Sequence, residues 1–541
     1  MNRINLLANY FVLKQLGGAK KKWTTMEHNG VMFPPEYVQH FTPVIYKGQE
    51  IILEKDAEED ATLYARYIDT DYIKNRIFNK NFWNDWRKVL GKENIIQSLE
   101  DCDFRLINNY LVKKKEEKIK IKTKPNKEEE EEKYKYAIVD GKKQPVGNFR
   151  IEPPGIFLGR GCNPKSGMIK RRIYPEDIII NIGPDAKVPE PLPGHHWKDV
   201  IHDRTVEWLA SWKDNITGKM KYVWLGAQSD MRARGDINKF DLARKLKRKI
   251  KDIRKQNEIV MKGSDPLMRQ IGTALYFIDN FALRVGNEKA EDETDTVGVT
   301  SLRVEHIDLL NDNNIKLDFL GKDSVRYNRT VQVDPQVYQN IKEFITNKNP
   351  NDQLFDLIVP NDINKYLQSF MKNLTAKVFR TYNASHLFQK ELKKITAKYD
   401  NYDEIDKINL LLDDFNKANA KVALLCNHQK NITKSTNKQI ENLDKMIKNA
   451  RIKLQKAKKT KNKNSSKIEQ MENTLKKLKT KKILKTELKN ISLGTSKINY
   501  IDPRITVAFI KKHNLPIDKI FSKTLQEKFK WAMDTDVNFV F

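Results

Sequence analysis

Tyr500 stands directly before a predicted helix start, in the stretch SKINYIDPRITVAF at residues 496–509. Asp502 is a good N-cap, Pro503 is a good first helical residue, and apolar residues follow at helical spacing. A helix N-terminus attracts anions, so a phosphate held there would lie near the phenol. A free tyrosine has a pKa near 10 and is only about a thousandth ionised at neutral pH, so a nucleophilic tyrosine needs cationic neighbours. From this segment alone, a packing role is favoured over a nucleophilic one.

Four other residues could supply such neighbours, and each also has a structural interpretation. Arg284 is predicted in the last turn of a helix that ends with Gly286 at C′, where the helix dipole favours a cation. Lys322 is predicted at the tip of a β-hairpin, where a lysine is usually solvated. Arg380 is predicted on a partly apolar helix, and an arginine on a buried side needs a partner, which favours a functional anion. His428 ends the apolar segment KVALLCNHQ, where a lone histidine is more often a cap than a catalyst.

The composition favours a polyanionic partner. The chain has 541 residues, with 100 Lys and Arg against 71 Asp and Glu and a net charge of +29, which favours nucleic acid or an anionic membrane. It has no apolar run of about 18 residues, so no membrane span is expected, and residues 1–18 lack a convincing signal-peptide cleavage site. Cys102, Cys162 and Cys426 show no paired spacing, so we expect neither a disulfide framework nor a zinc site, in a reducing compartment. Nucleic acid is therefore the preferred partner.

Changes in composition along the chain indicate several parts. Residues 137–229 are expected to be β-rich, with VEWLASW and KYVWLG pairing around the turn segment KDNITGK. The charge run at 113–133 is predicted to be a solvated helix or loop. A basic helix is predicted at 239–256, whose cations face either solvent or a phosphate backbone.

Residues 430–490 differ from the rest, with almost no Gly, Pro or aromatic residues. Apolar residues recur there at spacings of three and four, and KKTKNKNSSK at 458–467 interrupts the pattern. This predicts two helices folded back as an antiparallel hairpin. Residues 429–490 hold twenty Lys and Arg against five Asp and Glu, a net charge of +15. We expect so basic a hairpin to lie along a polyanion.

Longer stretches of the sequence carry a resemblance to a known family. They are IEPPGIFLGRG (151–161), KRRIYPEDIIINI (170–182), ALYFIDNFALRVGNEK (274–289), SLRVEHIDL (301–309), FLGKDSVRY (319–327), LTAKVFRTYNAS (374–385), LLCNHQ (424–429) and LGTSKINYIDPRITVAF (493–509). With these stretches the chain resembles the eukaryotic-type type IB DNA topoisomerases from Trp23 to Phe541. The resemblance implies an active site of two arginines, a lysine, a histidine and a tyrosine, which fall on Arg284, Arg380, Lys322, His428 and Tyr500.

The resemblance implies reversible transesterification of double-stranded DNA. The tyrosine would form a 3′-phosphotyrosyl bond and release a 5′-hydroxyl, the cut strand would rotate, and the hydroxyl would reseal it. The arginines and the histidine would stabilise negative charge on the phosphate, and Lys322 would act as general acid. One phosphoester replaces another, so neither ATP, a metal nor another cofactor is expected. The acidic stretch AEDETD at 290–295 is interpreted as a surface loop rather than a metal site.

The implied fold is α+β, a multidomain bilobed DNA clamp that acts as a monomer. Its expected parts are a β-rich N-terminal cap and DNA-binding core of two subdomains, a mainly helical catalytic core, a basic antiparallel coiled-coil linker and a small helical C-terminal domain with the nucleophilic tyrosine, at residues 1–229, 230–430, 431–490 and 491–541. The residues expected to contact DNA are Arg160, Lys165, Lys170, Arg171, Arg172, Asn287, Asp323, Ser324, Asn364 and Asn499. Most contacts should reach the backbone, so sequence preference should be weak.

The resemblance also sets expectations about inhibitors and location. The positions of Arg160, Asp323 and Asn499 line the family's site for camptothecin-type poisons, so sensitivity is expected, although the hairpin is somewhat shorter than is usual in the family. Family members act in the nucleus and carry a long charged N-terminal tail, whereas only AKKK at 19–22 precedes Trp23 here, which leaves nuclear import open. Heavy Lys and Asn usage is typical of an AT-rich genome, so a host nucleus, a viral factory or a virion are alternatives.

Two other functions are weighed against this one. A tyrosine recombinase uses the same residue types but needs specific sites and a synaptic tetramer, and the long N-terminal cap and basic hairpin argue against it. A non-catalytic architectural protein would bind DNA with a steep salt dependence and form no covalent adduct. The complete set of five catalytic residue types argues against that alternative.

Overall fold

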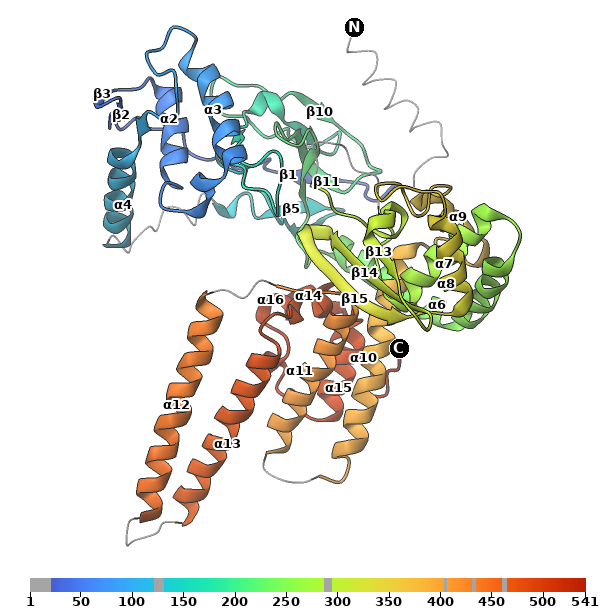
Figure 1. Cartoon of the computed structure of the whole chain (residues 1–541). Helices are drawn as coiled ribbons and strands as arrows, with labels where there is room; N and C mark the ends of the chain where they lie inside the picture. Colours follow the sequence, from blue (N-terminus) through green and yellow to red (C-terminus); the bar gives the residue numbers. More distant parts are fainter. Residues whose placement is uncertain (1–20, 121–130, 287–293, 403–405, 431–433, 460–464) are drawn as a thin grey trace. The chain divides into compact units, whose positions relative to one another are not determined.

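The structure is a computed structural model that describes residues 21–120, 131–286, 294–402, 406–430, 434–459 and 465–541. The chain forms two compact units, a first unit of residues 1–234 with 289–294 and a second unit of residues 235–288 with 295–541. Both contain helices and small sheets (Figure 1), which confirms a mixed α and β class. The division into four parts stays a prediction. Within the described residues, no helix is both long and apolar enough to cross a membrane.

Residues 44–120 of the first unit form a small sheet, in the order β3-β2-β4, and three helices. The elements are β2 Val44–Tyr46, β3 Gln49–Ile51, α2 Lys55–Ala65, α3 Arg76–Leu90, β4 Cys102–Asp103 and α4 Arg105–Lys120. Phe78, Phe82 and Trp86 recur every four residues on α3 and are fully buried, so one face of this helix forms the local core. Residues 112–117 of α4 are exposed, which confirms a solvated helix for that part of the charge run, whereas 121–130 lie outside the described residues.

The rest of the first unit is rich in β-structure, as predicted. Two sheets, in the orders β1-β5-β6 and β10-β9-β11-β12, and the pair β7-β8 share this region. The strands are β1 Met26–His28, β5 Tyr136–Val139, β6 Lys142–Pro145, β7 Gly155–Ile156, β8 Ile169–Lys170, β9 Ile179–Asn181, β10 Asp199–Ile201, β11 Trp208–Lys213 and β12 Met220–Trp224. The antiparallel pairing of β11 with β12 confirms the predicted hairpin around KDNITGK.

The second unit has one continuous hydrophobic core of helices around a three-stranded antiparallel sheet, β13-β14-β15. The elements are α6 Asp230–Lys262, α7 Pro266–Asn280, β13 Ile307–Leu309, β14 Asn314–Gly321, β15 Val325–Gln332, α8 Pro335–Ile345, α9 Pro360–Phe370, α10 Ala376–Tyr399, α11 Lys407–Leu425, α14 Leu493–Asn499, α15 Pro503–Lys512 and α16 Lys523–Lys528. Helix α10 packs against α7, α9, α11 and α15, so residues on several of its faces are buried. The predicted basic helix at 239–256 is confirmed as part of α6.

The predicted helical hairpin is confirmed in the second unit. Helices α12 Lys434–Lys459 and α13 Ser465–Glu487 run side by side (Figure 1). Ion pairs of Lys482 with Asp444 at 2.5 Å and of Lys458 with Glu472 join opposite ends of the two sequences, so the helices are antiparallel. Leu443, Ile447 and Leu454 are buried at spacings of four and seven, which are helical spacings that agree with the pattern that predicted the hairpin.

Candidate active site

Tyr500 lies at the junction of two helices. It caps the C-terminal end of α14, and its N–H donates to the carbonyl oxygen of Ser496 at 2.9 Å. Asp502 is the buried N-cap of α15 and accepts a hydrogen bond from the Arg504 N–H at 3.0 Å, which confirms the predicted cap. The sequence does not predict α14, because its Gly, Thr and Ser are weak helix formers. Two helix ends therefore hold the backbone of Tyr500.

Ser385 connects this junction to the long helix α10. Its hydroxyl is fully buried, donates to the carbonyl oxygen of Tyr500 at 3.0 Å and accepts from the N–H of Asp502 at 3.0 Å. Arg380 lies five residues earlier on the same helix. One hydroxyl thus couples the backbone of the tyrosine to the helix that carries a candidate catalytic arginine.

Arg380 is buried, with only 5% of its surface exposed. Its Nη1 donates to the carbonyl oxygen of Ala282, and its Nη2 lies 2.9 Å from the carbonyl oxygen of Cys426 and 3.4 Å from Nε2 of His428. None of these partners carries a full negative charge. Its buried Nε has no hydrogen-bond partner among the described residues. The guanidinium carbon lies 5.0 Å from the centre of the Tyr500 ring, so an uncompensated positive charge faces the phenol.

The His428 ring lies against the other candidate residues. Its centre is 5.2 Å from that of the Tyr500 ring, with the two planes 27° apart. Its Nδ1 is 2.7 Å from the hydroxyl oxygen of Ser496. Burial first, and then the positive charges of Arg380 and Arg284, lower the pKa of His428 from 6.5 to about 3. The ring is therefore neutral at physiological pH and carries one proton, on either Nδ1 or Nε2, and these two nitrogens have different surroundings.

A helix C-cap determines where the His428 ring lies. Helix α11 ends at Leu425, and Asn427 adopts a left-handed conformation with φ of 52°. The N–H of Asn427 donates to Leu424 O at 3.1 Å, and the N–H of His428 donates to Ala423 O at 2.8 Å. These two bonds form a Schellman motif with asparagine at C′. The backbone of His428 thus caps the helix, as one interpretation held, while its ring faces Tyr500.

The structure corrects the predicted setting of Arg284. Helix α7 ends at Asn280, so Arg284 lies in an irregular segment beyond the helix, and Gly286 is not its C′ residue. The segment is held by the N–H of Val299, which donates to the carbonyl oxygen of Arg284 at 2.9 Å. A Cβ on Gly298 would lie 2.3 Å from the Cα of Gly286. The glycine pattern reflects this close backbone approach and not a helix end.

Arg284 shares an electrostatic environment with the other candidate residues. Burial and then Arg380 lower the pKa of its guanidinium, while Tyr500 and Asp323 act in the opposite direction. Arg284, Arg380 and Lys322 line one small cavity of about 30 Å³. A space of that size holds about one water molecule. The cations therefore converge on a point and do not enclose a ligand-sized chamber.

Lys322 lies at the tip of the β14–β15 hairpin, which confirms the predicted location. The strands pair as far as Gly321 and Val325. Asp323 and Ser324 close the turn with positive φ angles of 68° and 57°. The Lys322 side chain is exposed and borders the cavity that Arg284 and Arg380 also line.

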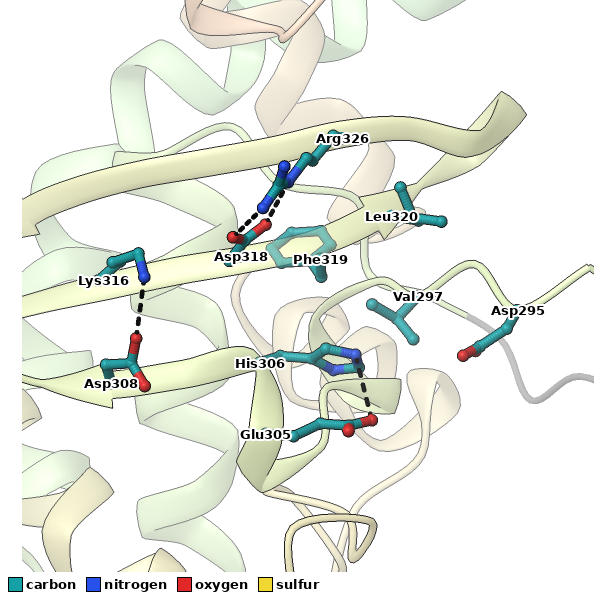
Figure 2. A pocket seen from close by; sticks show the side chains of 10 residues that line it. All are labelled: Asp295, Val297, Glu305, His306, Asp308, Lys316, Asp318, Phe319, Leu320 and Arg326. Carbon is teal, nitrogen blue, oxygen red and sulfur yellow. Dashed lines mark hydrogen bonds and ion pairs between the residues drawn. The ribbon is translucent and has the colours of Figure 1, made fainter. Parts of the chain in front are cut away.

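Ion pairs brace the sheet that carries this hairpin (Figure 2). Asp318 on β14 accepts from Arg326 on β15 at 2.7 Å, and Lys316 pairs with Asp308 on β13 at 3.2 Å. These residues border a cavity of about 450 Å³ together with His306. In the described part of the chain, no group of three or more His, Cys, Asp or Glu is placed to hold a metal. The cavity walls are thus mainly ion-paired groups that stiffen the Lys322 hairpin.

The residues of the second unit that are predicted to contact DNA lie on different structural elements. Asp323 and Ser324 lie on the hairpin tip, and Asn499 is exposed at the end of α14, next to the tyrosine. The Asn364 side-chain oxygen accepts from the first N–H of α10, from Ala376, at 3.0 Å, which is a structural contact. Asn287 lies outside the described residues. The DNA contacts of all these residues stay predictions.

The predicted DNA contacts of the first unit surround the β7–β8 loop. A Cβ on Gly167 would lie 2.0 Å from the carbonyl oxygen of Phe78, so only glycine allows this loop to pack on α3. Arg172 is paired with Glu59 at 2.8 Å, and Lys170 is paired with Glu152. The other members are exposed Arg160 and Arg171 and half-buried Lys165. Carboxylates therefore already pair with Lys170 and Arg172.

Sequence reasoning missed the serines that hold the site together, Ser385 and Ser496. Ser496 precedes the tyrosine by four residues, a helical spacing, and Ser385 follows Arg380 by five residues in the segment FRTYNAS. These spacings are the only local signals. The carbonyl partners of Arg380 have none, because every residue has a carbonyl group.

Comparisons with known proteins agree along the chain. Residues 21–225 match the family described as "Eukaryotic DNA topoisomerase I, DNA binding fragment", and residues 228–463 match "Eukaryotic DNA topoisomerase I, catalytic core". Residues 472–541 match the family described as "C-terminal topoisomerase domain".

Individual relatives are similar over most of the chain. This chain is 44% identical over 556 residues to "DNA topoisomerase 1 beta" of Arabidopsis thaliana, a match that covers 97% of this chain and 60% of the relative. It is 45% identical over 550 residues to "DNA topoisomerase 1" of Homo sapiens, covering 95% of this chain and 71% of the relative. The match to "DNA topoisomerase 1" of Schizosaccharomyces pombe is 43% over 623 residues, covering 95% and 76%. The chain thus spans about 60% of the length of the Arabidopsis relative and more of the other two. It belongs to the eukaryotic DNA topoisomerase I family.

Proposed function

We propose that this chain is a type IB DNA topoisomerase, which relaxes supercoiled duplex DNA by cutting one strand, allowing rotation and rejoining the strand. The observation that carries the proposal is the surroundings of the Tyr500 phenol. The Arg380 guanidinium carbon lies 5.0 Å from the ring centre, and the His428 ring centre lies 5.2 Å away. A phosphate between these groups would supply the negative charge that Arg380 lacks among its present partners.

In the proposed reaction the phenol oxygen of Tyr500 attacks a backbone phosphorus and its proton passes to water. The bond from phosphorus to the 5′-oxygen breaks, and the ammonium of Lys322 gives that oxygen a proton. The products are a 3′-phosphotyrosyl bond and a free 5′-hydroxyl. In the reverse reaction the hydroxyl attacks the phosphorus and the phenol leaves. Because one phosphoester replaces another, the cycle needs no external source of energy.

The two arginines and the histidine would stabilise the transition state. Its non-bridging oxygens carry extra negative charge, and the planar guanidinium of Arg380 can donate two hydrogen bonds to them. Arg284 would approach from the segment after α7, and neutral His428 can donate from one ring nitrogen. Donors fixed before the reaction act more strongly than donors that must reorganise. The backbone contacts of Arg380 and Ser385 supply that fixation here.

We propose that the two units bind a DNA duplex together as a bilobed clamp, with the α12–α13 hairpin as a basic coiled-coil linker. The predicted parts at 1–229, 230–430, 431–490 and 491–541 would then act as cap, catalytic core, linker and C-terminal domain. The DNA contacts would come from the β7–β8 loop, the Lys322 hairpin tip and Asn499. Contacts mainly with phosphates imply weak sequence preference.

The remaining expectations follow from the same proposal. The enzyme acts as a monomer on double-stranded DNA, and camptothecin-type compounds bind at the cleavage site beside Arg160, Asp323 and Asn499. The nucleus is the proposed location, because the relatives are eukaryotic topoisomerases. If the gene is viral, a host nucleus, a viral factory or a virion replaces it.

Relaxation of a supercoiled plasmid in EDTA without ATP tests the proposal. We expect complete relaxation, and denaturation during the reaction should trap the protein on the 3′ end of the nick. The variant Tyr500→Phe should bind DNA normally and relax none. Relaxation by that variant would refute the role of Tyr500, and trapping on the 5′ end would refute the proposed polarity.

The same experiment separates the alternative functions. Relaxation of plasmids of unrelated sequence by a monomeric protein contradicts a tyrosine recombinase. DNA binding without relaxation or a covalent adduct would support an architectural protein and overturn the proposal.

A further inference from the structure

Ser496 contacts both the candidate nucleophile and the candidate histidine. Its hydroxyl oxygen is 2.7 Å from Nδ1 of His428, and its carbonyl oxygen accepts the N–H of Tyr500 at 2.9 Å and that of Ile501 at 3.0 Å. Ser496 is fully buried, and His428 has only 7% of its surface exposed. No water can therefore readily replace the hydroxyl as the partner of Nδ1.

The two nitrogens of the His428 ring have different hydrogen-bond partners. Nε2 lies 3.4 Å from Nη2 of Arg380, which can only donate, so in the free protein Nε2 is best placed as an acceptor. A neutral ring then carries its proton on Nδ1 and donates it to the Ser496 oxygen. A phosphate oxygen only accepts, so with DNA bound, a proton on Nε2 is required for a hydrogen bond.

A hydroxyl suits both states because it both donates and accepts. When the proton is on Nδ1, the Ser496 oxygen accepts it. When the proton is on Nε2, the Ser496 hydroxyl turns and donates to the Nδ1 lone pair. A carboxylate or a carbonyl at this position would allow only the first arrangement.

We infer that Ser496 is a positioning residue, whose hydroxyl orients the His428 ring and lets its proton move to Nε2 when a DNA phosphate binds. Its carbonyl contacts place the same residue against the backbone of the nucleophile. One residue of α14 therefore contacts both the His428 ring and the backbone that carries the Tyr500 phenol. This inference rests on the proposed strand cleavage.

Single-turnover cleavage of a nicked or suicide DNA duplex tests the inference. We expect Ser496→Ala to cleave roughly tenfold more slowly, less than the about 10²–10³ typical for loss of a direct donor. DNA affinity should not change. Ser496→Cys keeps the size of the side chain with a weaker donor and should cleave at an intermediate rate, and Ser496→Thr keeps the hydroxyl and should restore most of the rate.

The pair of Thr396 and His513 offers a matched control. Their hydroxyl and Nε2 atoms lie 3.0 Å apart in the same unit, at the opposite end of α15 from Asp502. Thr396→Ala therefore removes an equivalent hydroxyl–imidazole bond outside the proposed site. We expect its cleavage rate to equal that of the unmodified protein, although its thermal unfolding temperature falls as in Ser496→Ala.

Ring-nitrogen chemical shifts of ¹⁵N-labelled histidine supply a readout that a purely structural role would not change. The Tyr500→Phe variant keeps the DNA intact, and the additional substitution His428→Gln assigns the signals. We expect the proton of His428 on Nδ1 in the free protein and on Nε2 with duplex bound. In the Ser496→Ala background the second state should be depleted.

The outcomes separate this inference from the proposed function. If the unmodified protein does not cleave DNA, the proposed function fails, while the ring shifts of the free protein still test the contact with Ser496. If the unmodified protein cleaves and Ser496→Ala cleaves equally fast, the inference alone is overturned. A His428 proton that stays on Nδ1 with DNA bound would also overturn it.

Discussion

The surroundings of Tyr500 and the α12–α13 hairpin are both strongly cationic, but their charges differ in number and in setting. Near Tyr500, Arg380 is buried and held by backbone carbonyls, and half-buried Arg284 lies beside the same cavity. The hairpin region, residues 429–490, carries twenty Lys and Arg, and most of those whose side chains the structure describes are exposed. Exposed charges are screened by salt and remain mobile, whereas buried charges act strongly at one point. The first arrangement suits a transition state, and the second suits a long polyanion.

The strongest challenge to this contrast is a conservative change at the buried position. Arg380→Lys keeps the charge but removes the fork that binds Ala282, Cys426 and His428. We expect single-turnover cleavage to fall by about 10²–10³ with little change in DNA affinity. Arg269→Lys, at an arginine paired with Glu343 at 2.6 Å, is the matched control and should cleave normally. Equal cleavage by both variants would contradict the special role of the buried fork.

Removing the α12–α13 hairpin tests whether its exposed charges contribute to DNA binding. The N–H of Lys430 donates to the carbonyl oxygen of Asn490 at 2.9 Å, so a short glycine linker can replace residues 434–487. We expect DNA affinity near 0.1 M salt to fall roughly tenfold or more, and the salt slope to become shallower by about 0.9 for each phosphate that the hairpin neutralises. Single-turnover cleavage at saturating protein should persist. An unchanged slope, measured by fluorescence anisotropy, would remove the hairpin from the binding surface.

The pH dependence of stability reports how strongly the site is desolvated. Burial, Arg380 and Arg284 lower the pKa of His428 to about 3, against 6.5 in the unfolded chain. Between these values the unfolded state binds more protons, so stability is complete above pH 6.5 and is lost as pH falls toward 3. Between pH 6.5 and pH 5 the loss amounts to about 1.6 kcal/mol, because the slope reaches 1.36 kcal/mol per pH unit only well below pH 6.5.

Thermal unfolding of the second unit at several pH values measures this effect. We expect His428→Gln to flatten the decline of stability between pH 6.5 and pH 5. The equivalent change at His28 should act on the first unit, where burial lowers the pKa of that histidine to about 4. A decline that survives His428→Gln unchanged would show that the ring is hydrated in solution.

The smallest expected effect concerns cations that are already paired with a carboxylate. Glu59 neutralises Arg172 at 2.8 Å in the first unit. Glu59→Gln should release Arg172 and raise DNA affinity about two- to fivefold, since such pairs contribute little. The matched control is Glu190→Gln, because Glu190 pairs with Lys187 at 3.4 Å on the open surface. Equal affinity gains in both variants would indicate a general charge effect and no specific role for Arg172.

The sequence predicted the elements whose signals are local. The hairpin followed from its apolar spacing, the Asp502 cap from residue type, and the Lys322 turn from strand alternation. The setting of Arg284 was wrong, because Gly286 was interpreted as a helix end. Its actual partner is Gly298, twelve residues away, and no local pattern indicates that a glycine is needed for a distant close approach.

By itself the sequence determined which residue types are available, the helices and strands that carry them, and the charge that favours a polyanion. The family resemblance then selected five of those residues. Only the tertiary structure decided that Arg380, His428 and Tyr500 meet, that Ser385 and Ser496 connect them, and that carbonyl groups hold the arginine. The physical reason is that burial and backbone hydrogen bonds depend on segments more than a hundred residues apart, such as Ser385 and Tyr500, whereas helix spacing and capping depend on neighbours.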